Sequence, residues 1–144
     1  TGWGVEANTE ELTGEGAVNG HKEALIDGNL NTFWHSQWDG EGKNPPLPHI
    51  IIFDMQQTQN ILSIELARRQ NNLDLKAVMS SISDDKENWT ELGKLDFPND
   101  KVPNAQIILL PKAISGRYFR TTVTDSNNGV NASIAEIMFT MGKK

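Results

Sequence analysis

Short alternating runs, separated by turn-forming residues, are the feature that most constrains how this chain can fold. In the clearest run, Leu62, Ile64 and Leu66 occupy every second position, as in a strand with one buried face. The run 49–53 is almost continuously apolar, which is typical of a strand buried on both faces. Further runs rich in β-branched and aromatic residues predict strands at 75–81, 90–97, 105–110, 118–124 and 134–141.

Glycine, proline, asparagine and aspartate residues lie between these runs and predict turns. They cluster at 27–29, 39–40, 44–46, 84–85, 98–100 and 127–129. Segments 10–17 and 21–25 predict one or two helical turns each, and Trp3 is expected to begin the first strand. About eight short strands between turns favour an all-β fold, an antiparallel β-sandwich or barrel. The Pro- and Gly-rich segment 36–48 predicts a long loop, a common place for binding groups.

Length and composition indicate one folded domain over residues 1–144. The 144 residues are 37% hydrophobic and 22% charged, which is typical of a folded domain rather than a disordered segment. Because there is no cysteine, disulfides, thiolate metal sites and a cysteine nucleophile are excluded. No apolar run approaches the roughly 18 residues of a membrane-spanning helix. The first residues lack a secretion signal, so the chain is expected to be cytosolic or a fragment of a larger mature protein.

Negative charge is concentrated at the start of the chain. The formal net charge is −6, and residues 1–42 contain eight acidic residues against Lys22 alone, a local charge of −7. The remaining eleven acidic and twelve basic residues almost cancel. Because the acidic segment would repel nucleic acid phosphates and anionic lipid headgroups, neutral partners or cations are expected.

Known catalytic motifs are absent from the sequence. It contains no Gly-x-Ser-x-Gly, His-Glu-x-x-His, phosphate-binding glycine loop or dinucleotide fingerprint. The histidines, His21, His35 and His49, lack the spacing of a metal site. Asp84 and Asp85 resemble a carboxylate pair for glycoside hydrolysis, but neighbouring acids at a strand end more commonly form a turn. No enzymatic activity is therefore expected of this chain itself.

The segment 24–38, Ala-Leu-Ile-Asp-Gly-Asn-Leu-Asn-Thr-Phe-Trp-His-Ser-Gln-Trp, resembles the signature of the discoidin family. That family includes the coagulation factor V/VIII type C domains and the family 32 carbohydrate-binding modules. Further segments that resemble the family follow in its order at 66–71, 83–89, 116–120 and 134–137. The resemblance covers nearly the whole chain and implies a galactose-binding-like, jelly-roll sandwich. The lack of cysteine and the tryptophan-rich loop after Thr32 are most similar to bacterial members.

The resemblance implies a structural calcium ion that joins the start of the chain to its end. The implied side-chain ligands are the carboxylates of Asp27 and Glu136 and the hydroxyl of Thr32. The implied backbone carbonyl ligands belong to Ala24, Asn29, Thr32 and Ala135. Calcium takes about six to eight hard oxygen ligands, which suits this set. Without the resemblance, Asp27 and Gly28 would be interpreted as a turn and Glu136 as a surface acid.

The resemblance also implies a sugar-binding site. A sugar needs an exposed aromatic platform and a few fixed polar groups. Trp38, in the long loop, is the candidate platform, whereas Trp34 is expected in the core. The candidate polar groups are His35, Arg69, Asn71, Asn72 and Asn128. A salt bridge is the alternative role of Arg69, and packing beside Trp34 is the alternative role of His35.

These features together predict a non-catalytic carbohydrate-binding module with a structural calcium. The expected ligand is a glycan of galactose or N-acetylhexosamine type. The resemblance implies covalent attachment to a glycan-active enzyme, such as a hexosaminidase, or to a surface protein, and export to the periplasm, cell surface or medium. The alternatives are an adhesion module that binds a protein or a lipid headgroup, and a structural spacer domain. The polar loops at 38–42 and 71–72 argue against lipid.

Overall fold

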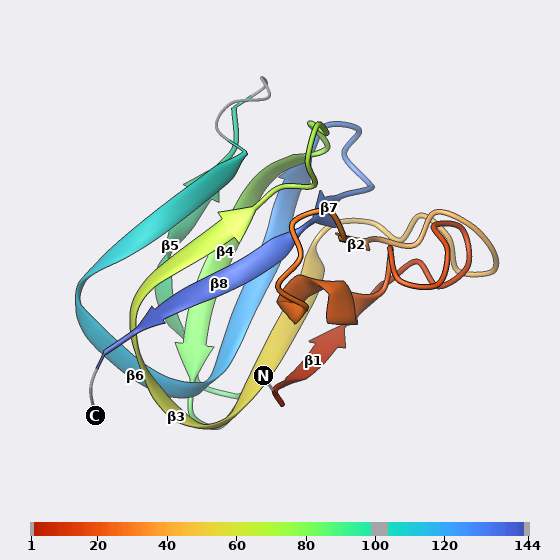
Figure 1. Cartoon of the computed structure of the whole chain (residues 1–144). Coiled ribbons are helices and arrows are strands. Elements are labelled where there is room, and N and C mark those ends of the chain that lie inside the picture. Colours follow the sequence, from red (N-terminus) through yellow and green to blue (C-terminus); the bar gives the residue numbers. More distant parts are fainter. Residues whose placement is uncertain (1, 99–103, 143–144) are drawn as a thin grey trace.

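A computed structural model describes residues 2–98 and 104–142 and shows antiparallel strands in two packed layers (Figure 1). The strands are β1 (Gly4–Ala7), β2 (Trp34–His35), β3 (His49–Ala67), β4 (Leu75–Ser83), β5 (Thr90–Asp96), β6 (Ala105–Ser126), β7 (Ser133–Ile134) and β8 (Glu136–Met141). A short 3-10 helix, η1 (Lys22–Ile26), precedes β2. The predicted antiparallel β-sandwich is confirmed. Within the described residues, no helix is long and apolar enough to cross a membrane.

The long strands β3 and β6 run through both layers of the sandwich. The first part of β3, 49–54, pairs with β1 and with the last part of β6, which also pairs with β4. The second part of β3, 59–67, pairs with β8 and with the first part of β6, 105–116. A register shift between Asp54 and Gln59 marks the place where β3 turns from one layer into the other. Both strands curve around the lower end of the molecule in Figure 1.

Some of the predicted element boundaries are wrong. The runs 105–110 and 118–124 were expected as separate strands, but both belong to β6, because residues 114–116 between them also pair with β3. A bulge at Leu62 leaves this side chain 38% exposed, whereas Ile61 and Ile64 are fully buried, so the expected alternation fails there. Segment 10–17 forms turns instead of helix, and Ala135 interrupts the predicted strand 134–141.

The predicted turn at 84–85 is confirmed at the C-terminal end of β4. Asp85 follows Asp84 and accepts hydrogen bonds from the backbone nitrogens of Glu87 (2.9 Å) and Asn88 (2.8 Å) and from the Ser83 hydroxyl (2.9 Å). These bonds are those of a tight turn, as expected for neighbouring acids at a strand end. The predicted turn at 98–100 lies partly outside the described residues.

The core lies between the two layers and is rich in aromatic side chains. Phe53 and Phe119 come from the layer that contains β1, and Phe139 of β8 reaches them from the other layer, with 4.8 Å between the ring centres of Phe119 and Phe139. Trp34 is fully buried, and its indole nitrogen donates a hydrogen bond to the carbonyl of Thr9 (2.8 Å). The predicted core position of Trp34 is confirmed.

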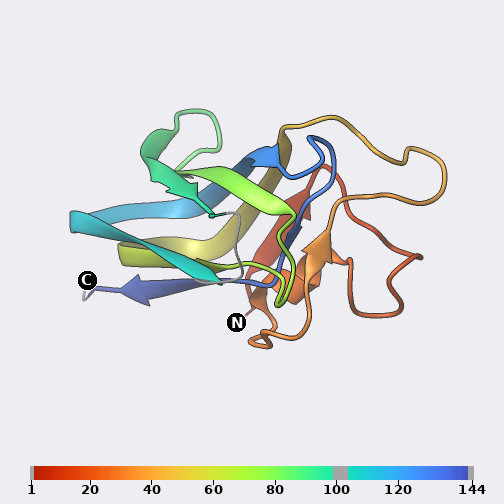
Figure 2. The ribbon, with the colours of Figure 1, turned by 90° about the horizontal axis from the view of Figure 1, so that it is seen from above.

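Two long loops extend from one end of the sandwich. Figure 2 shows segments 8–20 and 36–48 projecting from the same end, beyond β1 and β2. The short ladder between β2 and β7 places Trp34 opposite Ile134 and His35 opposite Ser133. The pair of Trp34 and Ile134 is therefore held in the core, while the pair of His35 and Ser133 lies towards the end of the sandwich from which the loops extend.

We expect Gly116→Ala to destabilise the fold. An added Cβ at this buried position in β6 would lie 2.4 Å from Cγ1 of Ile82 and 3.2 Å from the carbonyl oxygen of Ser83. Overpacking of this kind costs about 1–3 kcal/mol, which denaturant unfolding would measure. Gly4→Ala is the matched control, because its Cβ meets only Asp54 at an ordinary 3.7 Å. Equal stability of the two variants would contradict this account of β6 packing.

Candidate functional site

A pocket of about 320 Å³ lies among the loops at this end of the sandwich. Its volume is at the lower end of the range for small-molecule sites. Its lining residues come from four separate parts of the chain and are Glu15, His35, Trp38, Asp74, Asn127, Asn128 and Asn131. Three of the predicted sugar-binding residues, namely His35, Trp38 and Asn128, are thus brought together.

Trp38 presents a fixed aromatic surface to this pocket. Its indole nitrogen donates a hydrogen bond to Oε1 of Glu15 (3.1 Å). The ring packs so closely on the backbone of Gly14 that an added Cβ there would lie 2.5 Å from ring atom Cζ2. The residue is nevertheless 38% exposed. An aromatic ring that is both supported and exposed can stack on an apolar ligand face without first being ordered.

The loops that carry Trp38 and Gly14 are joined by the carboxylate of Glu11, which is only 1% exposed. Oε2 accepts hydrogen bonds from the backbone nitrogens of Thr13 (3.1 Å) and Gly14 (3.0 Å). Oε1 accepts from those of Trp38 (2.9 Å) and Asp39 (2.8 Å). One side chain therefore binds four donors on two loops.

Burial alone would raise the pKa of Glu11, but the four backbone donors outweigh it and lower the pKa from 4.5 to about 2. A group whose pKa is lower in the folded state stabilises that state above its unfolded pKa. Glu11 therefore contributes stability at neutral pH that is lost as the pH falls from about 4.5 towards 2.

His35 is oriented by its own neighbour in the chain. Its Nδ1 lies 2.6 Å from the carbonyl oxygen of Ser36, which can only accept, so Nδ1 carries the proton. In the neutral imidazole, Nε2 is then an acceptor, and it lies 3.9 Å from Oδ2 of Asp74. The ring is mostly buried beside Trp34, as the alternative interpretation of His35 expected, yet it also lines the pocket.

Asp74 is the most enclosed acid of the pocket. Oδ2 accepts a hydrogen bond from the Ser133 hydroxyl (2.7 Å), whereas Oδ1 is buried without a hydrogen-bond partner in the described part of the chain. Burial raises the pKa of Asp74, and the Ser133 hydroxyl and the nearby His35 and Arg69 oppose this effect. A partly buried carboxylate with one oxygen that lacks a hydrogen-bond partner favours a ligand that donates hydrogen bonds or carries positive charge.

The asparagines have different roles. Oδ1 of Asn128 accepts from the backbone nitrogens of Val130 (2.9 Å) and Asn131 (2.7 Å), so its amide NH₂ is left as a donor. Asn131 is used internally, because it accepts from the Ser36 hydroxyl (3.0 Å) and donates to Asn44 (3.1 Å). Asn128 is therefore the asparagine best suited to bind a ligand, and Asn131 positions the loops.

Arg69, Asn71 and Asn72 do not line this pocket. The Arg69 guanidinium stacks over the ring of Phe33, 3.9 Å from its centre, and influences Asp74 electrostatically. Asn72 accepts a hydrogen bond from the backbone nitrogen of Asp74 (2.8 Å) and so positions that acid. Asn71 is exposed with a φ of 61°. Direct sugar contacts by these residues remain a prediction from the family resemblance.

Sequence reasoning missed Glu11, Glu15, Asp74 and Asn131. Glu11 and Glu15 were counted only as part of the acidic segment, and nothing in their spacing distinguishes a buried acid from an exposed one. Asp74 immediately precedes β4, and an acid at a strand end beside a candidate site is the one signal that could have drawn attention to it.

A second group of oxygen atoms lies between the end of η1 and the start of β8. The backbone nitrogen of Gly28 donates to Oε2 of Glu136 (3.2 Å), 108 residues away in the chain. The Thr32 hydroxyl bonds to Oδ2 of Asp27 and to the carbonyl oxygen of Asn29 (3.0 Å). Four of the predicted calcium ligands are thus gathered. The other two flank them, with Ala24 buried in η1 and Ala135 directly before Glu136.

The electrostatics of this group suit a cation. Glu136 is 4% exposed, and its burial, together with the neighbouring carboxylate of Asp27, raises its pKa from 4.5 to about 8. Its second oxygen, Oε1, is buried without a hydrogen-bond partner in the described residues. Two close carboxylates, a hydroxyl and a carbonyl are hard oxygen donors of the kind that calcium prefers. The residues present therefore fit a divalent cation.

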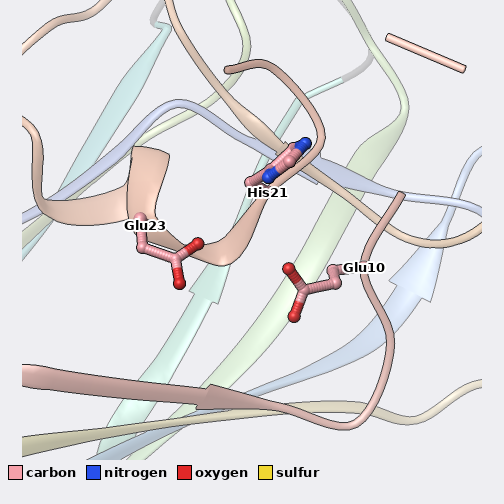
Figure 3. Close-up of side chains that lie close together, drawn as sticks. All are labelled: Glu10, His21 and Glu23. Atoms are coloured by element: carbon pink, nitrogen blue, oxygen red, sulfur yellow. The ribbon is translucent and has the colours of Figure 1, made fainter. Parts of the chain in front are cut away.

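A third cluster, Glu10, His21 and Glu23, has ligand atoms within 4.8 Å of one another (Figure 3). The ammonium group of Lys22, however, lies 3.2 Å from a carboxylate oxygen of Glu10 and 3.2 Å from one of Glu23. Because this lysine pairs with both acids and offsets part of their charge, the arrangement is accounted for as an ion-pair network without a metal.

Comparison with known proteins decides the family. The model of the F5/8 type C domain matches residues 5–137. The chain belongs to the F5/8 type C domain family. The fold of this F5/8 type C domain is also found in the C-terminal domain of a Bacteroides fragilis chitobiase, which is 37% identical, with a TM-score of 0.81 over 99% of this chain and 97% of that one.

Family 32 carbohydrate-binding modules share the fold at lower identity. One, from Clostridium perfringens NanJ in complex with galactose, is 20% identical, with a TM-score of 0.76 over 95% of this chain and 92% of that one. The lacto-N-biosidase of Bifidobacterium bifidum is 31% identical over 93% of the F5/8 type C domain, which spans 13% of that enzyme. The sialidase of Micromonospora viridifaciens is 36% identical over 47% of the domain, and the match spans 10% of the sialidase.

We expect Glu11→Gln to loosen the Trp38 loop. A glutamine keeps one acceptor oxygen but places an NH₂ group against two of the four backbone donors, and each unsatisfied donor costs about 1–3 kcal/mol. Amide hydrogen exchange should therefore accelerate at Trp38 and Asp39 or at Thr13 and Gly14. The exposed acid Glu87 provides a control, since Glu87→Gln should leave these amides protected. Unchanged protection in Glu11→Gln would contradict the role assigned to Glu11.

Proposed function

We propose that this F5/8 type C domain is a non-catalytic carbohydrate-binding module that holds a sugar in the Trp38 pocket. The observation that supports this most strongly is the fixed, exposed indole of Trp38 beside the free donor of Asn128 and the acceptor Nε2 of His35. A sugar ring has an apolar C–H face, which stacks on an aromatic ring, and hydroxyl groups, which both donate and accept. The pocket offers a partner for each.

The proposed ligand is a hexose of galactose or N-acetylhexosamine type. Relatives with this fold support the choice, since one was solved with galactose and another, from Clostridium perfringens, with GalNAc-β-1,3-galactose at 18% identity and a TM-score of 0.78. A sugar ring of about a dozen heavy atoms, at roughly −0.3 kcal/mol each, would bind with about −4 kcal/mol, a millimolar affinity.

Such weak binding is useful when the module is tethered. The chain spans about a tenth of the length of the curated relatives it matches, among them a sialidase and a lacto-N-biosidase. We propose that it is attached to a glycan-active enzyme, or to a surface protein, and is exported with it. Tethering raises the effective concentration of both partners at a glycan-bearing surface, so a millimolar site is sufficient.

We further propose that Asp27, Asn29, Thr32 and Glu136 hold a structural calcium ion, with carbonyls of Ala24 and Ala135 completing the set. The ion would supply positive charge between two carboxylates that otherwise repel each other. This chain's own contribution is to bring η1 and β8 together, as the bond from Gly28 to Glu136 does across 108 residues. Support comes from the buried, unpartnered Oε1 of Glu136 and from its raised pKa.

One observation favours the adhesion alternative. Leu12 and Val18 are exposed on the same loop as Glu15, so this end of the molecule presents apolar side chains as well as Trp38. The segment 1–42, however, carries a net charge of −7, which would repel an anionic membrane. Sugar binding therefore remains the better-supported function.

Trp38→Ala should weaken binding of galactose or N-acetylgalactosamine at least about tenfold, because it removes the stacking surface. Calorimetric titration of the folded variant would measure this loss. Leu109→Ala is the matched control, since Leu109 is an exposed apolar residue on β6 outside the pocket. Full binding by the Trp38 variant of a sugar that the wild type binds would place the site elsewhere.

Calcium removal should lower the melting temperature. At a calcium concentration about 100 times the dissociation constant, binding stabilises a fold by about 2.7 kcal/mol. Glu136→Gln should abolish this response, because it removes one of the two carboxylates. In chelator at pH 8 the same variant should melt no lower than the wild type. The reason is that the neutral glutamine removes the repulsion between the carboxylates of Glu136 and Asp27.

The control for the calcium experiment is Glu23→Gln, which changes an exposed acid of η1 and should keep the full calcium response. The measurement is the melting temperature of the wild type and both variants, with calcium and with chelator. An equal calcium response in the wild type and Glu136→Gln would rule out this ion site.

A further inference from the structure

The polar groups that line the pocket are mainly hydrogen-bond acceptors. Nε2 of His35 is an acceptor, because Nδ1 carries the proton. Glu15 and Asp74 contribute carboxylates, and only one oxygen of Glu15 is used by Trp38. The amides of Asn127 and Asn128 are the donors that remain, against the two carboxylates and the His35 ring. A ligand that donates hydrogen bonds is therefore better matched than one that accepts them.

The charge of the pocket is negative, which also favours a ligand that donates hydrogen bonds. Glu15 and Asp74 both line it, and no lysine or arginine is among its lining residues in the described chain. Outside the lining residues, the cation that acts on Asp74 is Arg69, whose guanidinium is engaged over the Phe33 ring.

Trp38 can also attract positive charge. A cation over the face of a tryptophan ring is stabilised by the negative charge of the π system. The ring is held by Glu15, so a cation close to the indole also lies close to a carboxylate. Aromatic and acidic groups together form the usual environment that binds an ammonium group.

We propose that this pocket binds a hexosamine with a free, protonated amine more tightly than its N-acetylated form, and binds a uronic acid most weakly. This inference rests on the proposed carbohydrate-binding function and names the chemical class of its ligand. Acetylation removes the positive charge of the amine, whereas a sugar carboxylate places a negative charge near Glu15 and Asp74. Exposed ion pairs contribute up to about 1 kcal/mol each, which corresponds to about a fivefold change in affinity.

The test uses sugars that each differ from the parent galactose or glucose in one group. Galactosamine, N-acetylgalactosamine and galacturonic acid, and the corresponding glucose series, are titrated into the ¹⁵N-labelled protein at pH 7 and constant ionic strength, and dissociation constants are taken from the chemical shifts. The amine should bind about fivefold more tightly than the N-acetyl sugar, and the acid should bind most weakly. Equal affinities, or the reverse order, overturn the inference while leaving sugar binding established. No shift with any of the sugars overturns the proposed function and the inference together.

The variant Glu15→Gln distinguishes the effect of a charge inside the pocket from the effect of the protein's net charge. The glutamine oxygen can still accept from the indole of Trp38, but the charge is gone, so the affinity ratio between amine and N-acetyl sugar should fall towards one. Glu41→Gln removes an equal charge from the outer part of the same loop as Trp38 and should preserve the ratio. A ratio that falls equally in both variants would show that net charge, and not the pocket, sets the preference, and so would contradict the inference.

Discussion

The carboxylate of Glu11 is the interaction on which the binding end of this domain depends. The loops of segments 8–20 and 36–48 extend beyond the sheets, and the backbone donors at their turns need partners other than neighbouring strands. Glu11 binds four of those donors and ties the turn at Gly14 to the turn at Trp38. Its burial is tolerated because the hydrogen bonds to the charged form outweigh the loss of water, as its low pKa shows. The position of the aromatic platform follows from this contact.

Glu136 shows the opposite outcome for the same kind of side chain. It is also buried, but it faces the carboxylate of Asp27 and has fewer backbone donors than Glu11, Gly28 among them, so its pKa is raised to about 8. The charged carboxylate of Glu11 therefore has all the hydrogen-bond donors it needs within the protein, whereas that of Glu136 needs a proton or a cation. This contrast explains why we assign a structural role to the first acid and an ion-binding role to the second. It also places the proposed ion on the contact between η1 and β8, away from the Trp38 pocket.

Features with local determinants could be predicted from the sequence. The turn from Asp27 to Thr32 is made by side chains within five residues, and it was recognised. The continuity of β3 was not, because the polar residues at 56–59 are as compatible with a turn as with an exposed bend. Glu15 and Asp74 could not be assigned to the pocket, because their hydrogen-bond partners are 23 and 59 residues away. The resemblance to the discoidin family supplied Glu136, which no local pattern marks.

The central claim is that the Trp38 pocket is where a sugar binds. The most direct measurement is a crystal structure of the protein grown with calcium and a saturating concentration of N-acetylgalactosamine. The account predicts a sugar ring stacked on the exposed indole of Trp38, with hydroxyl groups within hydrogen-bond distance of Nε2 of His35 and the amide of Asn128. A sugar bound elsewhere on the domain, with Trp38 uncovered, would contradict it.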